Sequence, residues 1–401
     1  MTTAKTVVPI TKPCLGEEED AAVKAVLASG WLVQGDKVVE FEDAVKSVVG
    51  TQYAIACTSC TTALHMALLA LGIGRDDKVV VPAYTFVATP NVVEYVGGKV
   101  VFADIDLGTF NIDMGSVRTN NAKAIIPVHL FGLCADMESV LGWSATQKAS
   151  TRSRVKIVED AACSLGSCCP SGNAGKIGDI GCFSFHPRKC VTTGEGGMVT
   201  ADNDMLAKTI YALRDFGFGV TDIERHRSGQ YSLPQVSLLG YNYRMTNIQG
   251  AIGVEQMKKY DRIVGERVRR AEIYNRELDG LDWLRLPIIP EGYGHTYQSY
   301  CLLVGGEGYR GNAGYREAYI RKWSPIKEQM MNTLKDDGIS TRGGTHACHM
   351  LDYYADKYGL IPNDFPNTKL ADALLVTIPL YAAMTDDDQQ RVIDAIRRFR
   401  V

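Results

Sequence analysis

The sequence predicts an α/β fold with a large domain at residues 1–255 and a smaller α+β domain at residues 256–401. Short apolar segments alternate with helical segments through the first half of the chain, which is typical of a mostly parallel sheet between helices. Several of these segments are continuously apolar, so both faces of the sheet are expected to be buried. After about residue 250 the sequence changes to long, charge-rich helical stretches, and 401 residues exceed one small core.

The elements of the large domain are expected in a regular order along the chain. Residues 15–49 form helices that break at the segment SGWLVQG, and residues 61–72 form a helix that ends at glycine. Strands are expected at residues 53–57, 78–84, 99–105, 122–130, 155–160, 181–185 and 197–200. Because ligands of parallel sheets bind at the carboxyl ends of the strands, polar residues that follow these strands are candidates for a site.

The smaller domain has fewer and longer elements. A helical stretch is expected at residues 247–278, a strand at 297–304, a helix at 315–337 and a final helix at 386–399. This mixture predicts an α+β unit that follows the parallel sheet in the chain.

The composition excludes several classes of partner. A net charge of −3 gives no electrostatic basis for binding nucleic acid or an anionic membrane. No apolar run is long enough to span a bilayer, and the first residues lack the apolar core of a signal peptide. The 11 cysteines are scattered and mostly lie in apolar runs, which favours reduced, buried thiols. A cytoplasmic location is therefore expected.

Three residues suggest a cofactor. Asp160 ends an apolar strand, Ser184 ends another, and Lys189 follows five residues later. This pattern suits pyridoxal 5′-phosphate (PLP), because the lysine forms the Schiff base, the aspartate pairs with the pyridine nitrogen and the serine holds phosphate. Burial is expected to lower the pKa of Lys189 and make it a better nucleophile. The alternatives are a helix-capping aspartate and a surface lysine.

A second polar group lies where the strand at residues 53–57 meets the next helix. The sequence Thr58–Thr62 offers hydroxyl groups and the free backbone N–H groups of a helix start, which favour a phosphate. Simple capping of the helix is the structural alternative. Cys57 and Cys60 also form a C-x-x-C pattern, which leaves a redox role as a third interpretation.

Eight motifs together resemble the DegT/DnrJ/EryC1/StrS family of PLP-dependent sugar aminotransferases, which have the aspartate aminotransferase fold of type I. The resemblance covers nearly the whole chain. The motifs are SGWLVQG, TSCTTALHMALLALGIG, VVVPAYTFVATPN, ADIDLGTFNID, AIIPVHLFG, IVEDAACSLGS, CFSFHPRKCVTTGEGGMVT and GYNYRMTNIQGAIG. Some relatives replace the lysine with histidine and act as dehydratases, so the presence of Lys189 implies transamination.

The resemblance implies a role for each of nine residues. Lys189 and Asp160 are the catalytic residues. Residues that hold the cofactor are Ser59, Cys60 and Thr61 in the phosphate turn, Phe86 stacked on the ring, Asp160, Cys163, Ser184, Lys189 and Asn242. Asn242 matches a phosphate contact from the neighbouring subunit, which implies a homodimer with shared active sites. Cys163 stands where many members have a glutamine that bonds the ring hydroxyl, and a thiol is a weak donor.

The implied reaction converts a nucleotide-linked 4-keto-6-deoxy sugar to the 4-amino sugar with glutamate as amino donor, as in GDP-perosamine synthases. The same chemistry on a 3-keto sugar nucleotide is an alternative. A non-catalytic regulatory protein with the same fold is another. The sequence leaves open the nucleotide, the position of the ketone and its stereochemistry.

Several histidines and one arginine near these motifs have more than one interpretation. His129 ends a strand, and His346 and His349 lie in GTHACHM, where packing, substrate contact and metal binding are all open. No metal site is expected, because further ligands are lacking. His186 and Arg188 flank Lys189, and Arg188 either binds an anion bidentately or forms a structural ion pair.

Overall fold

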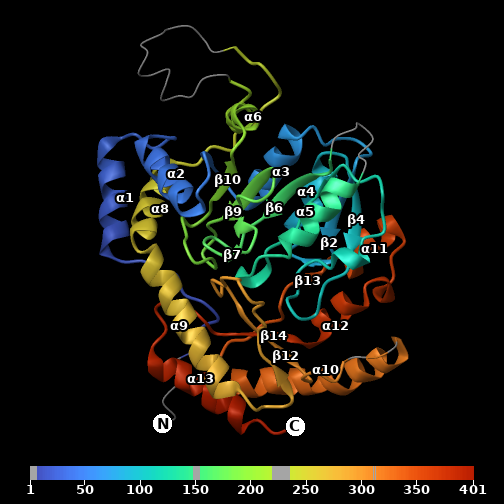
Figure 1. Ribbon diagram of the computed structural model, residues 1–401. Coiled ribbons are helices and arrows are strands. Elements are labelled where there is room, and N and C mark those ends of the chain that lie inside the picture. Colours follow the sequence, from blue (N-terminus) through green and yellow to red (C-terminus); the bar gives the residue numbers. More distant parts are fainter. Residues whose placement is uncertain (1–6, 148–153, 219–234, 310, 312) are drawn as a thin grey trace.

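A seven-stranded sheet forms the centre of the large domain. The computed structural model describes residues 7–147, 154–218, 235–309, 311 and 313–401 (Figure 1). The strand order is β1-β10-β9-β6-β5-β2-β4. β10 runs antiparallel to both of its neighbours, and every other neighbouring pair in the sheet is parallel. The predicted α/β class, with a mostly parallel sheet between helices, is confirmed.

The strands of this sheet are short and buried. Their bounds are β1 Tyr53–Cys57, β2 Lys78–Pro82, β4 Lys99–Ala103, β5 Ala124–Ile125, β6 Lys156–Asp160, β9 Ile180–Ser184 and β10 Gly197–Ala201. Two small antiparallel pairs lie outside it. One is the hairpin of β7 Cys168–Cys169 with β8 Gly172–Asn173, and the other joins β3 Tyr84–Thr85 to β13 His346–Ala347.

Helices cover both faces of the sheet, which is why the strands read as continuous apolar runs. One face packs against α2 Asp36–Val49, α5 Met137–Thr146 and α8 Asn247–Lys258. The other face packs against α3 Cys60–Ala70, α4 Ala88–Tyr95 and α6 Asp204–Arg214. Successive strand residues alternate between the two cores: Ala54 and Ala56 face one, Ile55 and Cys57 the other.

The two N-terminal helices end where the sequence predicts. α1 spans Glu17–Ser29 and ends at Gly30, and α2 ends at Gly50. Both glycines have a positive φ, 72° and 78°, a backbone conformation that is open to glycine at little steric cost.

Two predicted elements differ from the structure. The expected strand at residues 122–130 is paired only over Ala124–Ile125 in β5, because Pro127 has no N–H to donate and the chain then turns. Its continuation still follows β6, since Asp160 N donates to Pro127 O and His129 N donates to Asp160 O. The expected helix at residues 247–278 is divided into α8 and α9, Tyr260–Leu278, at Lys259.

The C-terminal part packs around a three-stranded antiparallel sheet, in a core that also includes side chains of the large domain such as Tyr84 and Phe131. Its strands are β11 Leu284–Arg285, β12 Tyr300–Val304 and β14 Leu375–Ile378. Its helices are α9, α10 Ala313–Asp336, α11 Asp352–Tyr358, α12 Pro366–Leu374 and α13 Asp386–Arg398. In Figure 1, α10, α12 and α13 lie below the sheet of the large domain, and α11 lies at its right side near β4. The N-terminal segment joins this part as well, since Val8 bridges to Ile339 and Leu380 N donates to Ile10 O.

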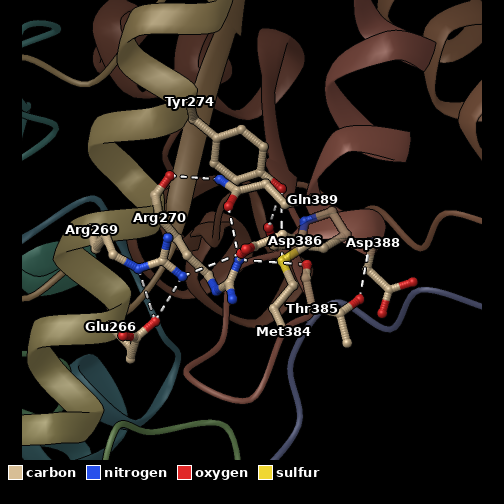
Figure 2. A network of polar contacts seen from close by, with 10 residues as sticks. Glu266, Arg269, Arg270, Tyr274, Met384, Thr385, Asp386, Asp388 and Gln389 are labelled. Carbon is tan, nitrogen blue, oxygen red and sulfur yellow. Dashed lines mark hydrogen bonds and ion pairs between the residues drawn. The ribbon is translucent and has the colours of Figure 1, made fainter.

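A polar network joins α9 to α13 inside this C-terminal part (Figure 2). The buried Arg270 on α9 donates to Gln389 Oε1 at 2.9 Å and to Asp386 Oδ1 at 3.2 Å. Gln389 in turn donates to the Arg270 carbonyl at 2.7 Å. The charge of Arg270 is therefore paired within the protein, and these contacts join α9 to α13.

Candidate active site

The site lies at the edge of the sheet where the parallel strands end. Asp160 ends β6, Ser184 ends β9, and Cys57 ends β1. β10 is reversed and begins at this edge with Gly197. Gly197 is paired with Cys57 on one side and with Ser184 on the other. The sheet thus brings the turn after Cys57 and the hydroxyl of Ser184 to the same edge.

Gly197 is required by the close approach of the phosphate turn. A Cβ atom at this position would lie 2.3 Å from the Ser59 carbonyl carbon and 2.6 Å from the Cys60 nitrogen. Any side chain would therefore push the start of α3 away from β10. The sequence TTGEGG places a glycine where the helix start must lie directly against the sheet.

The start of α3 combines a cap with free donors. Ser59 is the N-cap, and its Oγ accepts a hydrogen bond from Thr62 N at 3.2 Å. Ser59 therefore caps the helix, as the structural alternative expects. The N–H groups of Cys60 and Thr61 have no acceptor within the helix, so they remain available to an anion, with the helix dipole behind them.

The carboxylate of Asp160 is buried and held from two sides. Thr89 Oγ1 donates to Asp160 Oδ2 at 2.8 Å, and Ala162 N donates to Oδ1 at 3.2 Å. Thr85 Oγ1 lies 3.0 Å from Thr89 Oγ1 and can donate to it. Burial raises the pKa of Asp160, although these hydrogen bonds and the Lys189 charge oppose the shift. A cation nearby would stabilise this carboxylate.

Lys189 lies in a turn after β9 and points at a sulfur atom. Its Nζ donates to Cys163 Sγ at 3.1 Å. Burial pulls its pKa down, but Cys163, Cys60 and Asp160 together outweigh burial, so the pKa is raised. The expected lowering of this pKa is therefore wrong, because burial is accompanied by acidic neighbours. The sequence did not predict this contact between Cys163 and the amine of Lys189.

Phe86 and His346 form one border of the site. Phe86 follows β3 and is exposed, with its ring centroid 5.7 Å from that of His346 in an edge-to-face arrangement. β13 brings His346 there, because it pairs with β3 and sets His346 opposite Thr85. The C-terminal part thus supplies a residue beside the ring that is predicted to stack on the cofactor.

Asn242 is placed differently from the other predicted residues. Its backbone forms a bridge with Asp215, and its side chain is exposed. The next residue, Tyr243, accepts a hydrogen bond from Thr58 N at 3.0 Å. The segment therefore supports the phosphate turn of its own chain while Asn242 is exposed at the surface.

The thiols of the C-x-x-C pattern have none of the properties of a redox pair. Cys57 and Cys60 are both buried and free. Burial raises the pKa of Cys57 to about 11 and that of Cys60 well above its ordinary value. Reactive thiols need a lowered pKa, so these side chains serve packing.

Two of the open histidines have structural roles. His129 Nδ1 accepts from Ala135 N at 3.0 Å, so the proton of the neutral ring lies on Nε2, 2.8 Å from Glu159 Oε2. His349 is buried against Phe365, and burial lowers its pKa. Within the part of the chain that the structure describes, no three His, Cys, Asp or Glu side chains gather as metal ligands.

His186 organises the turn that carries Lys189. Its Nδ1 accepts from Arg188 N at 3.2 Å, and its carbonyl accepts from Lys189 N at 2.8 Å. Burial lowers the pKa of His186. The imidazole therefore shapes the approach to Lys189 through the backbone.

Thr89 is the residue that sequence reasoning missed. It lies in the motif VVVPAYTFVATPN, four residues after Thr85, and α4 begins at Ala88. Thr85 lies in β3 and Thr89 in the first turn of α4, so no single repeat pattern in the sequence marks the two threonines as a pair. Thr89 donates to Asp160, which is 71 residues away in the chain, so only the fold reveals this contact.

The residues present fit PLP. The buried Asp160 has a raised pKa and would be stabilised by a protonated ring nitrogen, and Lys189 supplies the amine. The start of α3 and Ser184 lie on either side of Gly197 and form an anion cradle, which the absence of a side chain at Gly197 allows to pack closely.

Comparison with known proteins gives relatives along almost the whole chain. A family model for the DegT/DnrJ/EryC1/StrS aminotransferase family matches residues 13–397. An uncharacterized protein of Methanocaldococcus jannaschii is 35% identical over 393 residues, 97% of each chain. A spore coat polysaccharide biosynthesis protein of Bacillus subtilis is 33% identical over 393 residues, covering 97% of this chain and 96% of the relative.

A solved structure agrees with this assignment. The sugar aminotransferase from Micromonospora echinospora is 25% identical, with a TM-score of 0.82 over 97% of this chain and 99% of that one. No helix in the described ranges is both long and apolar enough to cross a membrane. The chain belongs to the DegT/DnrJ/EryC1/StrS aminotransferase family and is a PLP-dependent aminotransferase.

Proposed function

We propose that the protein is a cytoplasmic, homodimeric aminotransferase that converts a nucleotide-linked 4-keto-6-deoxy sugar to its 4-amino sugar with glutamate as donor. The observation that carries the proposal is the convergence of Lys189, Asp160 and the anion cradle at one edge of the sheet. Residues 1–255 form the large PLP-binding domain in this proposal, and residues 256–401 form the small C-terminal domain.

PLP, when bound, supplies an electron sink that makes the carbon bearing the amino group acidic. Lys189 would hold the cofactor and then, once free, move a proton at that carbon. Cys163 Sγ, 3.1 Å from its Nζ, would hold the amine in position. Asp160 would keep the ring nitrogen protonated, and Thr89 and Ala162 N fix the direction of its carboxylate.

Relatives support a sugar as the amino acceptor. The Bacillus subtilis relative is named a spore coat polysaccharide biosynthesis protein, and the Micromonospora echinospora structure is described as a sugar aminotransferase. The 4-keto-6-deoxy acceptor rests on the resemblance of the motif SFHPRK…TTGEGG to perosamine-synthase-like members.

Exposed groups around Asn242 support a second subunit. Leu239 is close to Asn242 in the chain and is 82% exposed. Phe216 follows Asp215, which forms a backbone bridge with Asn242, and it is 42% exposed. Exposed apolar side chains that lie near one another favour a protein contact. A second copy docked there would bring Asn242 to the phosphate turn of its partner.

Absorption spectroscopy and product analysis test the proposal. The purified protein should absorb in the visible range, lose that absorbance on addition of glutamate, and lack it in Lys189→Ala. A colourless protein that PLP does not reconstitute would contradict catalysis and favour a regulatory role.

The acceptor is tested separately. Protein first treated with glutamate should recover its absorbance with a GDP-, dTDP- or UDP-linked 4-keto-6-deoxy sugar, and nuclear magnetic resonance of the product should place the new amine at C4. An amine at C3 would overturn the proposed regiochemistry, and no recovery with any of the three sugars would overturn the proposed acceptor.

A further inference from the structure

Three cysteines that the proposed reaction does not use lie where two segments of the large domain meet. Cys134 follows a short helical turn after β5, and Cys168 and Cys169 form β7. The two segments are tied together, since Ser167 Oγ donates to the Gly132 carbonyl at 2.6 Å. Cys134 and Cys169 each come two residues after one partner of this hydrogen bond, so the fold holds them near each other.

The two cysteines of β7 point in opposite directions, as successive residues of a strand do. Cys169 is buried in the same core cluster as Cys134. Cys168 is only partly buried and faces Gly294, where a Cβ atom would lie 2.7 Å from the Cys168 Sγ. Cys169 is therefore the cysteine of β7 that packs with Cys134.

The thiols of Cys134 and Cys169 form a hydrogen bond with each other. This bond is the largest cause that lowers the pKa of Cys169, to about 6, and it raises the pKa of Cys134. The shared proton thus stays on Cys134, and Cys169 is ionised at neutral pH. The thiolate is the reactive form of cysteine, which distinguishes Cys169 from Cys57 and Cys60, whose pKa values are raised.

We propose that Cys134 and Cys169 are a redox pair that hydrogen peroxide converts to a reversible disulfide. Pro170 and Ser171, which follow Cys169 in the turn between β7 and β8, are both exposed. Cys169 is thus one residue from the surface, and a molecule as small as peroxide has a short path to its sulfur. This modification site is separate from amino transfer and does not depend on the proposed substrate.

The chemistry needs two steps, both of which the pair supplies. The Cys169 sulfur attacks peroxide, so an S–O bond forms, the O–O bond breaks and hydroxide leaves. The Cys134 sulfur then attacks the sulfenic acid, so the S–S bond forms, the S–O bond breaks and the Cys134 proton leaves with the oxygen as water. Two thiols and one peroxide give one disulfide and two water molecules. Cys169 is thereby kept from further, irreversible oxidation.

Mass spectrometry of a digest made without reducing agent tests the pair. Trypsin releases Cys134 in the peptide 124–148 and Cys169 in the peptide 157–176. After the holoenzyme is treated with peroxide, these two peptides should be recovered joined, and dithiothreitol should separate them. The rate of joining should change by less than about twofold between pH 7 and pH 8, because Cys169 is already ionised at pH 7.

Substitutions identify the sulfur atoms, because the peptide 157–176 also contains Cys163 and Cys168. Cys134→Ser and Cys169→Ser should each abolish the joined peptides. Cys168→Ser, the matched control at the neighbouring position, should form them as the wild type does. In Cys134→Ser the resolving sulfur is absent, so dimedone, which reacts with sulfenic acids, should label Cys169.

Three outcomes would overturn the inference. The first is a wild type that yields no joined peptides at a peroxide concentration that oxidises the exposed Met205. The second is a wild type in which Cys169 becomes a sulfinic acid without joining, which would show that Cys134 does not resolve it. Both are measured on the wild type and do not depend on the folding of a variant. The third is loss of joining in Cys168→Ser with retention in Cys169→Ser, which would assign the disulfide to Cys168.

Discussion

Charged side chains are buried both at the junction between α9 and α13 and at the edge of the large sheet. The two regions differ in how far protein partners neutralise these charges. At the junction, Arg270 is matched by Asp386 and Gln389 (Figure 2). At the sheet edge, Asp160 keeps a raised pKa in spite of its hydrogen bonds.

This difference separates stability from function. A buried charge that is paired with a carboxylate of a neighbouring helix holds the two elements together. A buried charge that is only partly matched costs folding free energy, and a ligand of opposite charge can recover that cost. The following predictions test whether the two regions respond to substitution in opposite ways.

Asp160→Asn should have the largest effect of these substitutions, and it should impair catalysis without lowering stability. The kcat should fall by about 100- to 1,000-fold, because the neutral amide cannot stabilise a protonated ring nitrogen. Since the pKa of Asp160 is raised on folding, its ionised form destabilises the protein above that pKa, and the penalty disappears as the pH falls. The apoprotein of the variant should therefore be at least as stable as the wild type at neutral pH, as measured by urea unfolding. Lower stability with normal kcat would reverse the proposed role.

Arg270→Ala should affect stability and leave kcat unchanged. Removal of its guanidinium leaves Gln389 Oε1 buried without this donor and removes packing between α9 and α13. We expect the free energy of unfolding to fall by about 2 kcal/mol, in the range for a lost buried hydrogen-bond network. Urea unfolding of the whole protein, followed by circular dichroism, measures this loss. A fall in kcat without a fall in stability would contradict the comparison.

Cys163→Ala should change the reactivity of Lys189. Because Cys163 is the largest influence that raises the pKa of Lys189, its removal should lower that pKa and leave more of the amine unprotonated at pH 8. The apoprotein should then combine with PLP faster, by about tenfold for each unit of pKa. Visible absorbance after mixing gives the rate, and Lys189→Ala gives the background. An unchanged rate at every pH between 7 and 10 would show that the Cys163 contact has no influence on the amine.

Arg269→Ala should have the smallest effect, although Arg269 neighbours Arg270 in Figure 2. Its side chain pairs with Glu266 at 3.0 Å and with Asp386 at 3.3 Å, and all three groups are well exposed to solvent. Exposed ion pairs contribute roughly 0–1 kcal/mol, so the variant should unfold within about 0.5 kcal/mol of the wild type. A loss as large as that in Arg270→Ala would show that exposure does not distinguish the two arginines.

Much of the fold was predictable because its signals are local. The apolar run that ends at Asp160 and the glycine that ends α1 each reflect a neighbourhood of a few residues. Lys189, Asp160 and Ser184 were proposed as site residues on similar grounds: Asp160 and Ser184 end strands, Lys189 follows soon after, and parallel strands end at a common edge. The early end of β5, for which Pro127 is a local signal, and the break at Lys259 were missed.

By itself, the sequence determined the fold class, the sheet edge where the site lies and the side chains that suit PLP, because these follow from residue type and order. Only the tertiary structure decided what surrounds each of them. It placed Thr89 on Asp160, Cys163 on Lys189 and Cys134 against Cys169. These partners lie far apart in the chain or beyond any local pattern, and their effects on charge depend on distances of a few ångströms.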